Sequence, residues 1–357
     1  METQCPFCGA RFEGDDAAAR RLEHEQVCAQ RPPAEVSNAD PVFPVPAAPT
    51  GIRGLFFNER ELRAGWRFAI YVVLTVVCVV GLSLGTAWLL RARRGSFQPL
   101  VTQLVELASF VGALLPALLM AKIERRSLRD YGLPVSQAFG RRFWEGLLFG
   151  LAAVTLLMVM MSGAHAFYFG HLGMHGVRIL KWAAFWGVFF LWVGFFEEFA
   201  FRGYTLFTLT TGMGFWPAAL LLSAMFGAVH LGNPGEAWVG GLSAGLIGLF
   251  LAFSFRRTGS LWWAVGFHQS FDWGETFLYS VPNSGMSTPG HLLNSYFHGP
   301  RWLTGGTVGP EGSVLVFLLI LLLFVIFDRM YRTVQFPPWE ARATSPAAVV
   351  ENPSLLR

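Results

Sequence analysis

Charged side chains are scarce in this chain: 14% of its 357 residues are Asp, Glu, Lys or Arg, whereas 53% are hydrophobic. That composition is too apolar for a soluble domain. Several windows of about 20 apolar residues indicate a protein that crosses the membrane repeatedly. The net charge is +4, but the arginines stand mostly at the ends of apolar runs. There they act as orientation signals, so we expect no nucleic-acid partner.

Cysteine is also rare, with four in the chain. Cys5, Cys8, His24 and Cys28 form a C-x2-C-x15-H-x3-C pattern that suits a tetrahedral structural zinc. The first 30 residues carry cysteine and charge but no apolar core of a secretory signal. We therefore expect a zinc-finger-like module at 1–30 with a docking or regulatory role, and the sequence does not identify its partner. Disulfide pairing is the alternative, which a reducing cytoplasm disfavours.

We expect a Pro-rich linker at 31–52, a transmembrane domain at 53–334 and a disordered tail at 335–357. The transmembrane domain is predicted to be an all-α, polytopic bundle of about eight spans. Lys and Arg are more numerous in the loops of one predicted side, which places both termini in the cytoplasm. The expected spans are 68–90, 100–121, 143–161, 182–208, 216–232, 236–255, 260–281 and 313–331.

Two adjacent carboxylates and a guanidinium interrupt the fourth of these apolar runs. Each ionisable group at a helix centre costs roughly 2.5–3.5 kcal/mol, so such groups usually work in pairs or in a site. Glu198 and Arg202 are four residues apart with the acid first, which predicts an ion pair on one helix face. Glu197 is rotated by about 100° from Glu198 and needs a partner from another helix.

Two histidines in later apolar runs are candidate partners for Glu197. His230 and His268 interrupt such runs, and Asp272 lies one helical turn after His268. At 1.5 Å per residue from the connecting turns, Glu197 and these three residues reach nearly the same depth. We therefore expect one polar chamber. Glu197 and His230 would activate a water there, and His268 with a protonated Asp272 would stabilise an oxyanion during peptide hydrolysis.

Three other functions stay open. Glu197, His230 and His268 could hold a catalytic zinc, as in a metalloprotease, although the HExxH spacing is absent. A transporter would also place such residues at midplane, but no inverted repeat is visible in the sequence. In a non-catalytic scaffold, the zinc module would bind a partner and the buried charges would lock the bundle together.

The motifs Glu197-Glu198-x-x-x-Arg202, Phe226-x-x-x-His230 and His268-x-x-x-Asp272, in that order, resemble the CPBP family. This family comprises CAAX-processing and bacteriocin-processing intramembrane proteases, also called the Abi family. The resemblance covers about 120–280. It implies an integral membrane endopeptidase, embedded in the lipid bilayer, that cleaves membrane-associated proteins or peptides near their C-terminus.

The resemblance also implies roles for single residues. Glu197 and His230 would activate the water, His268 and the residue at 272 would stabilise the oxyanion, and Glu198 and Arg202 would support them. Eukaryotic prenyl-protein proteases of this type resemble a pattern with Asn at the last position, where this chain has Asp272. Asp272 is then either protonated or orients His268. Between the two mechanisms described for the family, we favour glutamate-activated water without a catalytic metal over a metalloprotease.

Overall fold

The computed structural model describes residues 2–6, 8–14, 16–28, 51–58, 62–93, 96–235 and 237–336. Nearly all of the expected linker and of the expected tail lies outside the described residues. The chain divides into two compact units, Met1–Glu61 and Leu62–Arg357. Each unit is described by itself.

The first unit contains a small hairpin followed by a helix. β1 (Glu2–Gln4) pairs antiparallel with β2 (Arg11–Glu13), and α1 (Ala17–Val27) follows. Cys5 and Cys28 are buried, although the fold is too small for a large apolar core. A short helix, α2 (Ile52–Phe56), lies near the end of this unit.

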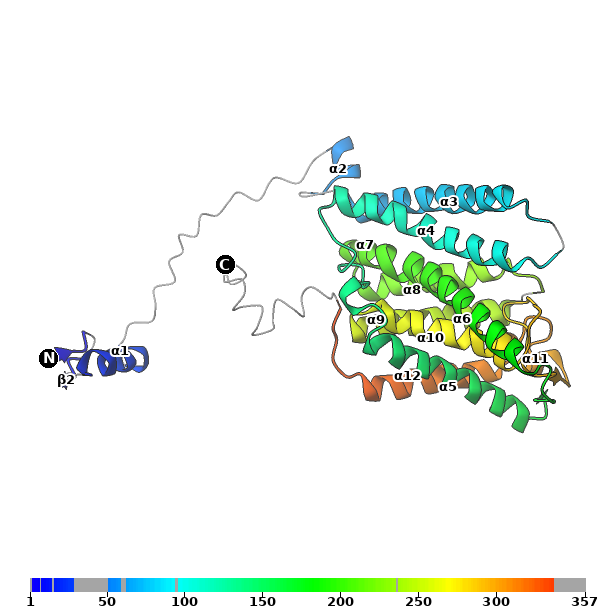
Figure 1. Ribbon diagram of the computed structural model, residues 1–357. Helices are drawn as coiled ribbons and strands as arrows, with labels where there is room; N and C mark the ends of the chain where they lie inside the picture. Colours follow the sequence, from blue (N-terminus) through cyan, green and yellow to red (C-terminus); the bar gives the residue numbers. More distant parts are fainter. Residues whose placement is uncertain are drawn as a thin grey trace. The chain divides into compact units, whose positions relative to one another are not determined.

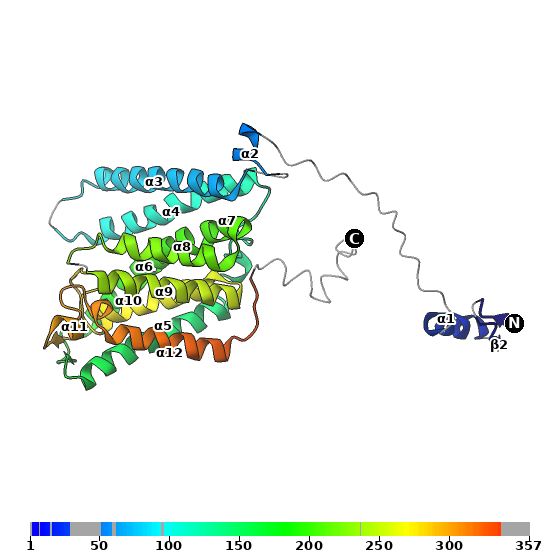
Figure 2. The same ribbon diagram turned by 180° about the vertical axis from the view of Figure 1, so that it is seen from behind.

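The second unit, called the membrane unit below, is a helical bundle, which confirms the all-α prediction. Figure 1 and Figure 2 show its long helices side by side with roughly aligned axes. They are α3 (Ala64–Leu89), α4 (Pro99–Ile123), α5 (Arg141–Gly163), α6 (Val177–Glu198), α7 (Tyr204–Met213), α8 (Phe215–His230), α9 (Trp238–Thr258), α10 (Leu261–Trp273) and α12 (Leu315–Met330).

Five helical stretches among the described residues are long and apolar enough to cross a bilayer, against about eight predicted spans. They are α3, α4, α5, α9 and the continuous stretch Val177–Met213 that contains α6 and α7. The three other predicted spans contain shorter helices: α8 and α12 have 16 residues each and α10 has 13. These α-helical lengths are below the roughly 20 residues of a full crossing, and α10 continues to Leu278 in a π-helical turn.

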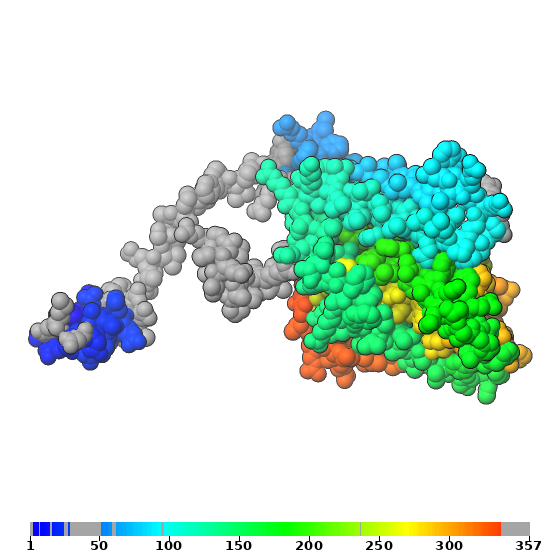
Figure 3. Space-filling view, in the orientation of Figure 1, coloured from blue at the N-terminus to red at the C-terminus, as the bar shows by residue number. Residues whose placement is uncertain are grey.

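Glycines bring α10 close to its neighbour α5. A Cβ on Gly146 of α5 would lie 1.9 Å from the Trp263 carbonyl oxygen, and one on Gly266 of α10 would lie 2.2 Å from that of Phe143. Both separations are shorter than any real Cβ contact, so the two backbones touch directly. α10 also packs against α6. Figure 3 shows the face of the bundle that α4, α5 and α6 cover.

The helices α6 and α10 each continue into a π-helical turn. η2 (Phe199–Gly203) links α6 to α7, and η3 (Gly274–Leu278) follows α10. Such turns are rare and occur frequently at functional sites. Both come directly after residues that the sequence singles out.

The segment between η3 and α12 is folded over one end of the bundle. Its strand β4 (Tyr296–Phe297) pairs with β3 (Phe167–Tyr168), and two short helices follow, α11 (Arg301–Thr304) and η4 (Pro310–Gly312). Ser243 of α9 donates a hydrogen bond from Oγ to the Glu311 carbonyl oxygen at 2.7 Å, which ties η4 to the bundle.

Candidate active site

His268 is the residue on which the predicted acids converge. Its Nδ1 lies 2.8 Å from Glu198 Oε1. Its Nε2 lies 3.4 Å from Asp272 Oδ2 and 3.7 Å from Glu197 Oε2. The sequence prediction that Asp272 shares a helix face with His268 is confirmed. An ionised carboxylate can accept a hydrogen bond but cannot donate one, so Nδ1–H of His268 donates to Glu198. The other ring nitrogen, Nε2, faces Glu197 and Asp272.

The predicted ion pair between Glu198 and Arg202 is also confirmed. Arg202 Nη1 lies 3.3 Å from Glu198 Oε1, and the two side chains are 2% and 0% exposed. The guanidinium carbon lies 4.3 Å from the centre of the Phe226 ring, a cation–π contact. Gly248 of α9 makes room for this arrangement, because a Cβ there would lie 2.6 Å from Arg202 Nη2.

Glu197 is more accessible than its neighbour, with 23% of its side chain exposed. It is on the last turn of α6, directly before η2. As expected from the rotation of about 100° between adjacent helical residues, the two glutamates face different directions. Glu198 points into a buried ion pair, whereas Glu197 keeps a free edge beside His268.

His230 is at the C-terminal end of α8, and its orientation is set within its own helix. Its Nδ1 lies 2.9 Å from the Phe226 carbonyl oxygen, and its ring packs on Phe226 with centroids 4.3 Å apart. A carbonyl oxygen only accepts, so Nδ1 carries the proton and Nε2 of the neutral ring has a free lone pair. Among the described residues, Glu197 pairs with His268 and has no ion pair with His230. A joint role for Glu197 and His230 stays a prediction.

A small cavity lies beside His268 and Asp272, and neither Glu197 nor His230 is among its lining residues. It has a volume of about 40 Å³, and its lining includes Phe226, His268 and Asp272 together with apolar side chains of α9 and α10. A cavity needs roughly 10–15 Å³ to hold one water molecule, so this one has room for a hydrolytic water. The Phe226 ring lines the cavity and also packs against the ring of His230, one turn further along α8.

Residues 178–274 match the family model described as type II CAAX prenyl endopeptidase Rce1-like. This part of the chain is therefore similar to the CAAX-protease family. The match spans all three motifs, from Glu197 through His230 to Asp272, and confirms the predicted resemblance. At the family level this match supports an intramembrane endopeptidase of the CAAX type. No curated protein and no solved structure matches the chain.

One acid near the candidate active site was missed in the sequence although a signal was present. Glu106 of α4 lies close enough to Glu197 for their charges to repel each other. One turn further on, Phe110 stacks on Phe195 at 5.0 Å, which places this face of α4 against α6. Glu106 interrupts the predicted span 100–121, so the rule that singled out Glu197 also applied to it.

A second missed acid, Glu311 of η4, gave no signal, because it stands in a Gly-Pro-Glu-Gly turn outside every predicted span. Its Oε2 accepts hydrogen bonds from Ser284 N and Oγ at 2.9 and 3.0 Å. Burial and the charge of Asp272 raise the pKa of Glu311 to about 7, against the lowering effects of His230 and Ser284. The folded segment before α12 thus brings an acid toward both His230 and Asp272.

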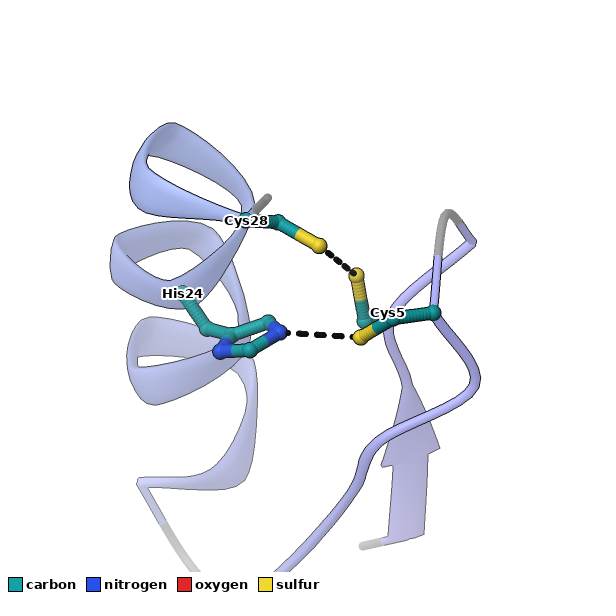
Figure 4. A group of neighbouring side chains, drawn as sticks. Cys5, His24 and Cys28 are labelled. Carbon is teal, nitrogen blue, oxygen red and sulfur yellow. Dashed lines mark hydrogen bonds between the residues drawn. The ribbon is translucent and has the colours of Figure 1, made fainter. Parts of the chain in front are cut away.

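The N-terminal cluster could hold a metal ion. Ligand atoms of Cys5, Cys8, His24 and Cys28 all lie within 4.8 Å of one another. Cys5 Sγ is 3.9 Å from Cys28 Sγ, and Cys8 Sγ is 3.1 Å from His24 Nε2 (Figure 4). Zn–S bonds of about 2.3 Å imply S···S separations of about 3.8 Å in a tetrahedron, so the donor set fits. The sulfurs are too far apart for a disulfide, which needs about 2.05 Å.

Proposed function

We propose that the chain is an intramembrane endopeptidase in which Glu197 and His230 activate a water for attack on a peptide bond. The observation that carries the proposal is the convergence of Glu197 and Asp272 on Nε2 of His268 beside the 40 Å³ cavity. Glu197 has the exposed edge that a general base needs, and the hydrogen bond from Nδ1 of His230 to the Phe226 carbonyl oxygen leaves Nε2 as the ring's second nitrogen for the water.

In the proposed mechanism, the attacking water gives its proton to Glu197 or His230, and the carbonyl oxygen of the substrate becomes an oxyanion. His268, when Nε2 is protonated, donates a hydrogen bond to that oxyanion. Glu198 holds Nδ1 of His268 and is itself held by Arg202, so the ring keeps one orientation. Asp272 lies close enough to Nε2 to orient it, which supports the positioning role over direct oxyanion binding.

The arrangement of the acids favours this mechanism over a catalytic zinc. Among the described residues, the ligand atoms of Cys5, Cys8, His24 and Cys28 lie within 4.8 Å of one another, whereas those of Glu197, His230 and His268 form no such cluster. The proposed substrates are membrane-associated proteins or peptides with CAAX-type C-termini. We further propose that the N-terminal cluster holds a structural zinc and docks a partner, and that both termini lie in the cytoplasm.

The decisive variant is Glu197→Gln in the full chain reconstituted in nanodiscs. We expect cleavage of CAAX-type reporter peptides, prenylated and unprenylated, to fall by about 10²–10⁴-fold, while the thermal unfolding midpoint stays unchanged. A scaffold would instead lose stability without any cleavage in the parent protein. Full cleavage by folded Glu197→Gln would refute the proposed role of Glu197.

A chelator separates the zinc alternatives. In a chain lacking residues 1–50, cleavage should resist the chelator if Glu197 activates the water directly, and should be lost if a catalytic metal is required. The N-terminal cluster is tested separately by the zinc content of the full chain. We expect one zinc ion per chain in the parent protein and none in the double variant Cys5→Ser with Cys8→Ser.

A further inference from the structure

A cavity of about 490 Å³ lies at one end of the membrane unit, away from the candidate active site. Four separate segments line it: the connection between α4 and α5, the first turn of α5, the turn between α9 and α10, and the stretch after α12. All four are at helix ends, where apolar spans give way to arginines. Such positions are at the level of lipid headgroups.

The lining is basic and contains no acidic side chain. Three arginines contribute to it, Arg129, Arg141 and Arg142, together with the uncharged polar residues Ser136, Gln137 and Gln335. Guanidinium groups present several donors in a fixed plane that matches phosphate oxygens, and the polar residues add further donors. The volume is in the range of pockets that bind small molecules.

Two of the arginines are held in place. Arg141 Nε and Arg142 Nη1 lie 2.6 and 2.9 Å from the two oxygens of Glu145. The guanidinium of Arg142 also lies 5.3 Å from the centre of the Tyr331 ring. One carboxylate thus orients two guanidinium groups and neutralises half of their charge. The cavity therefore keeps an excess of positive charge before Arg129 is counted.

Arg129 is exposed and forms no ion pair among the described residues. The neighbouring carboxylate of Asp130 is engaged elsewhere, since its Oδ2 accepts a hydrogen bond from Ser127 N at 2.9 Å. Three arginines thus line one cavity, and the single carboxylate of Glu145 pairs with two of them.

We propose that this cavity binds a phosphate group. Anionic phospholipid headgroups and free phosphate share that chemistry, and basic pockets between transmembrane helices are known to bind lipid headgroups. The proposal is independent of the proteolytic mechanism, because none of the lining residues belongs to the candidate active site.

The test compares the full chain with Arg129→Gln, Arg142→Gln and the double variant, using native mass spectrometry after equilibration with phosphatidylglycerol or phosphatidylcholine. Each arginine near an anionic surface changes binding by about fivefold, so the double variant should retain about 25-fold less phosphatidylglycerol. Arg178→Gln, an exposed arginine outside the cavity, is the matched control and should retain as much as the parent.

A second arm titrates inorganic phosphate in lipid-free detergent. Preferential retention of phosphatidylglycerol that the variants lose would identify a lipid headgroup as the source. Saturable phosphate binding that the variants lose would identify free phosphate. Equal retention of both lipids together with no phosphate binding by the parent would overturn the proposal, as would unchanged binding in the double variant. If Arg142→Gln fails to fold without its ion pair, Arg129→Gln alone decides the outcome.

Discussion

Two of the groups of charged side chains in the described part of the membrane unit differ in how their charges are paired. In the first, Glu124 accepts from Tyr204 Oη and faces Arg67 and Arg126, and Arg67 also donates to Thr211 Oγ1 at 2.8 Å. Both of its carboxylate oxygens are therefore engaged. In the second, three carboxylates surround one imidazole and one guanidinium, and Glu197 keeps an exposed edge. In the first group one fully engaged carboxylate faces two guanidinium groups, which is the pairing of a structural group. In the second group the carboxylates outnumber the guanidinium groups, and Glu197 stays partly exposed near a cavity.

The largest expected effect concerns His268, which touches all three acids of the second group. His268→Ala should reduce peptide cleavage by about 10²–10⁴-fold, because both oxyanion stabilisation and the orientation of Nε2 are lost. The measurement is kcat/KM in nanodiscs, normalised to folded protein. Activity within a factor of three of the parent would mean that the second group is structural like the first.

Breaking the first group should act on stability instead. Arg67→Met leaves Glu124 buried without its main partner and should destabilise the fold by about 3–5 kcal/mol. The measurement is the thermal unfolding midpoint, with cleavage per folded molecule unchanged. The double variant Arg67→Met with Glu124→Gln should regain much of the loss, since no unpaired charge is left. A cleavage defect as large as that of His268→Ala would erase the distinction between the two groups.

The substitution Gly248→Ala, which adds a methyl group between α9 and Arg202, should have an intermediate effect on stability and cleavage. Gly248→Ala puts a Cβ 2.6 Å from Arg202 Nη2, so Arg202 must move and with it Glu198 and His268. Overpacking of this kind costs about 1–3 kcal/mol, and we expect cleavage to fall as well. Gly85→Ala in α3 is the matched control, because no atom lies within 4 Å of its new Cβ. It should be neutral or slightly stabilising.

The smallest expected effect is the pH dependence contributed by Glu311. Its pKa is raised to about 7 in the folded protein. Its stabilising contribution is therefore complete below the ordinary value of about 4.5 and is lost as pH rises toward 7. The slope is at most on the order of 1 kcal/mol per pH unit. Unfolding midpoints between pH 5 and 8 should fall more steeply in the parent than in Glu311→Gln, and parallel curves would contradict this.

The local parts of both units could be predicted from the sequence. Spacings of four residues on one helix gave the pairs Glu198–Arg202 and His268–Asp272, and the Cys/His spacing gave the N-terminal ligand set. These predictions succeed because helical geometry fixes which side chains meet.

Contacts between distant segments could not be predicted in the same way. The pairing of Arg67 with Glu124 joins residues 57 positions apart, and the approach of Glu311 to His230 depends on how the segment before α12 folds. The rise of 1.5 Å per residue correctly predicted that Glu197 and His268 lie at the same depth in the bundle. It does not predict how each helix is rotated about its own axis. For that reason it did not reveal that His268, and not His230, is the residue in ion-pair contact with Glu197.

The π-helical turn η2 has a consequence for the long stretch Val177–Met213. A wider turn inserted into an α-helix shifts the faces of the two flanking segments out of phase, by about the 100° that one residue contributes. The first segment, α6, accordingly packs against α4 and α10, whereas the second, α7, packs against α3 and α8. One continuous helical stretch thereby packs against two different sets of helices. Deleting a single residue from η2 would rotate α6 relative to α7, so that both segments could not keep their present contacts.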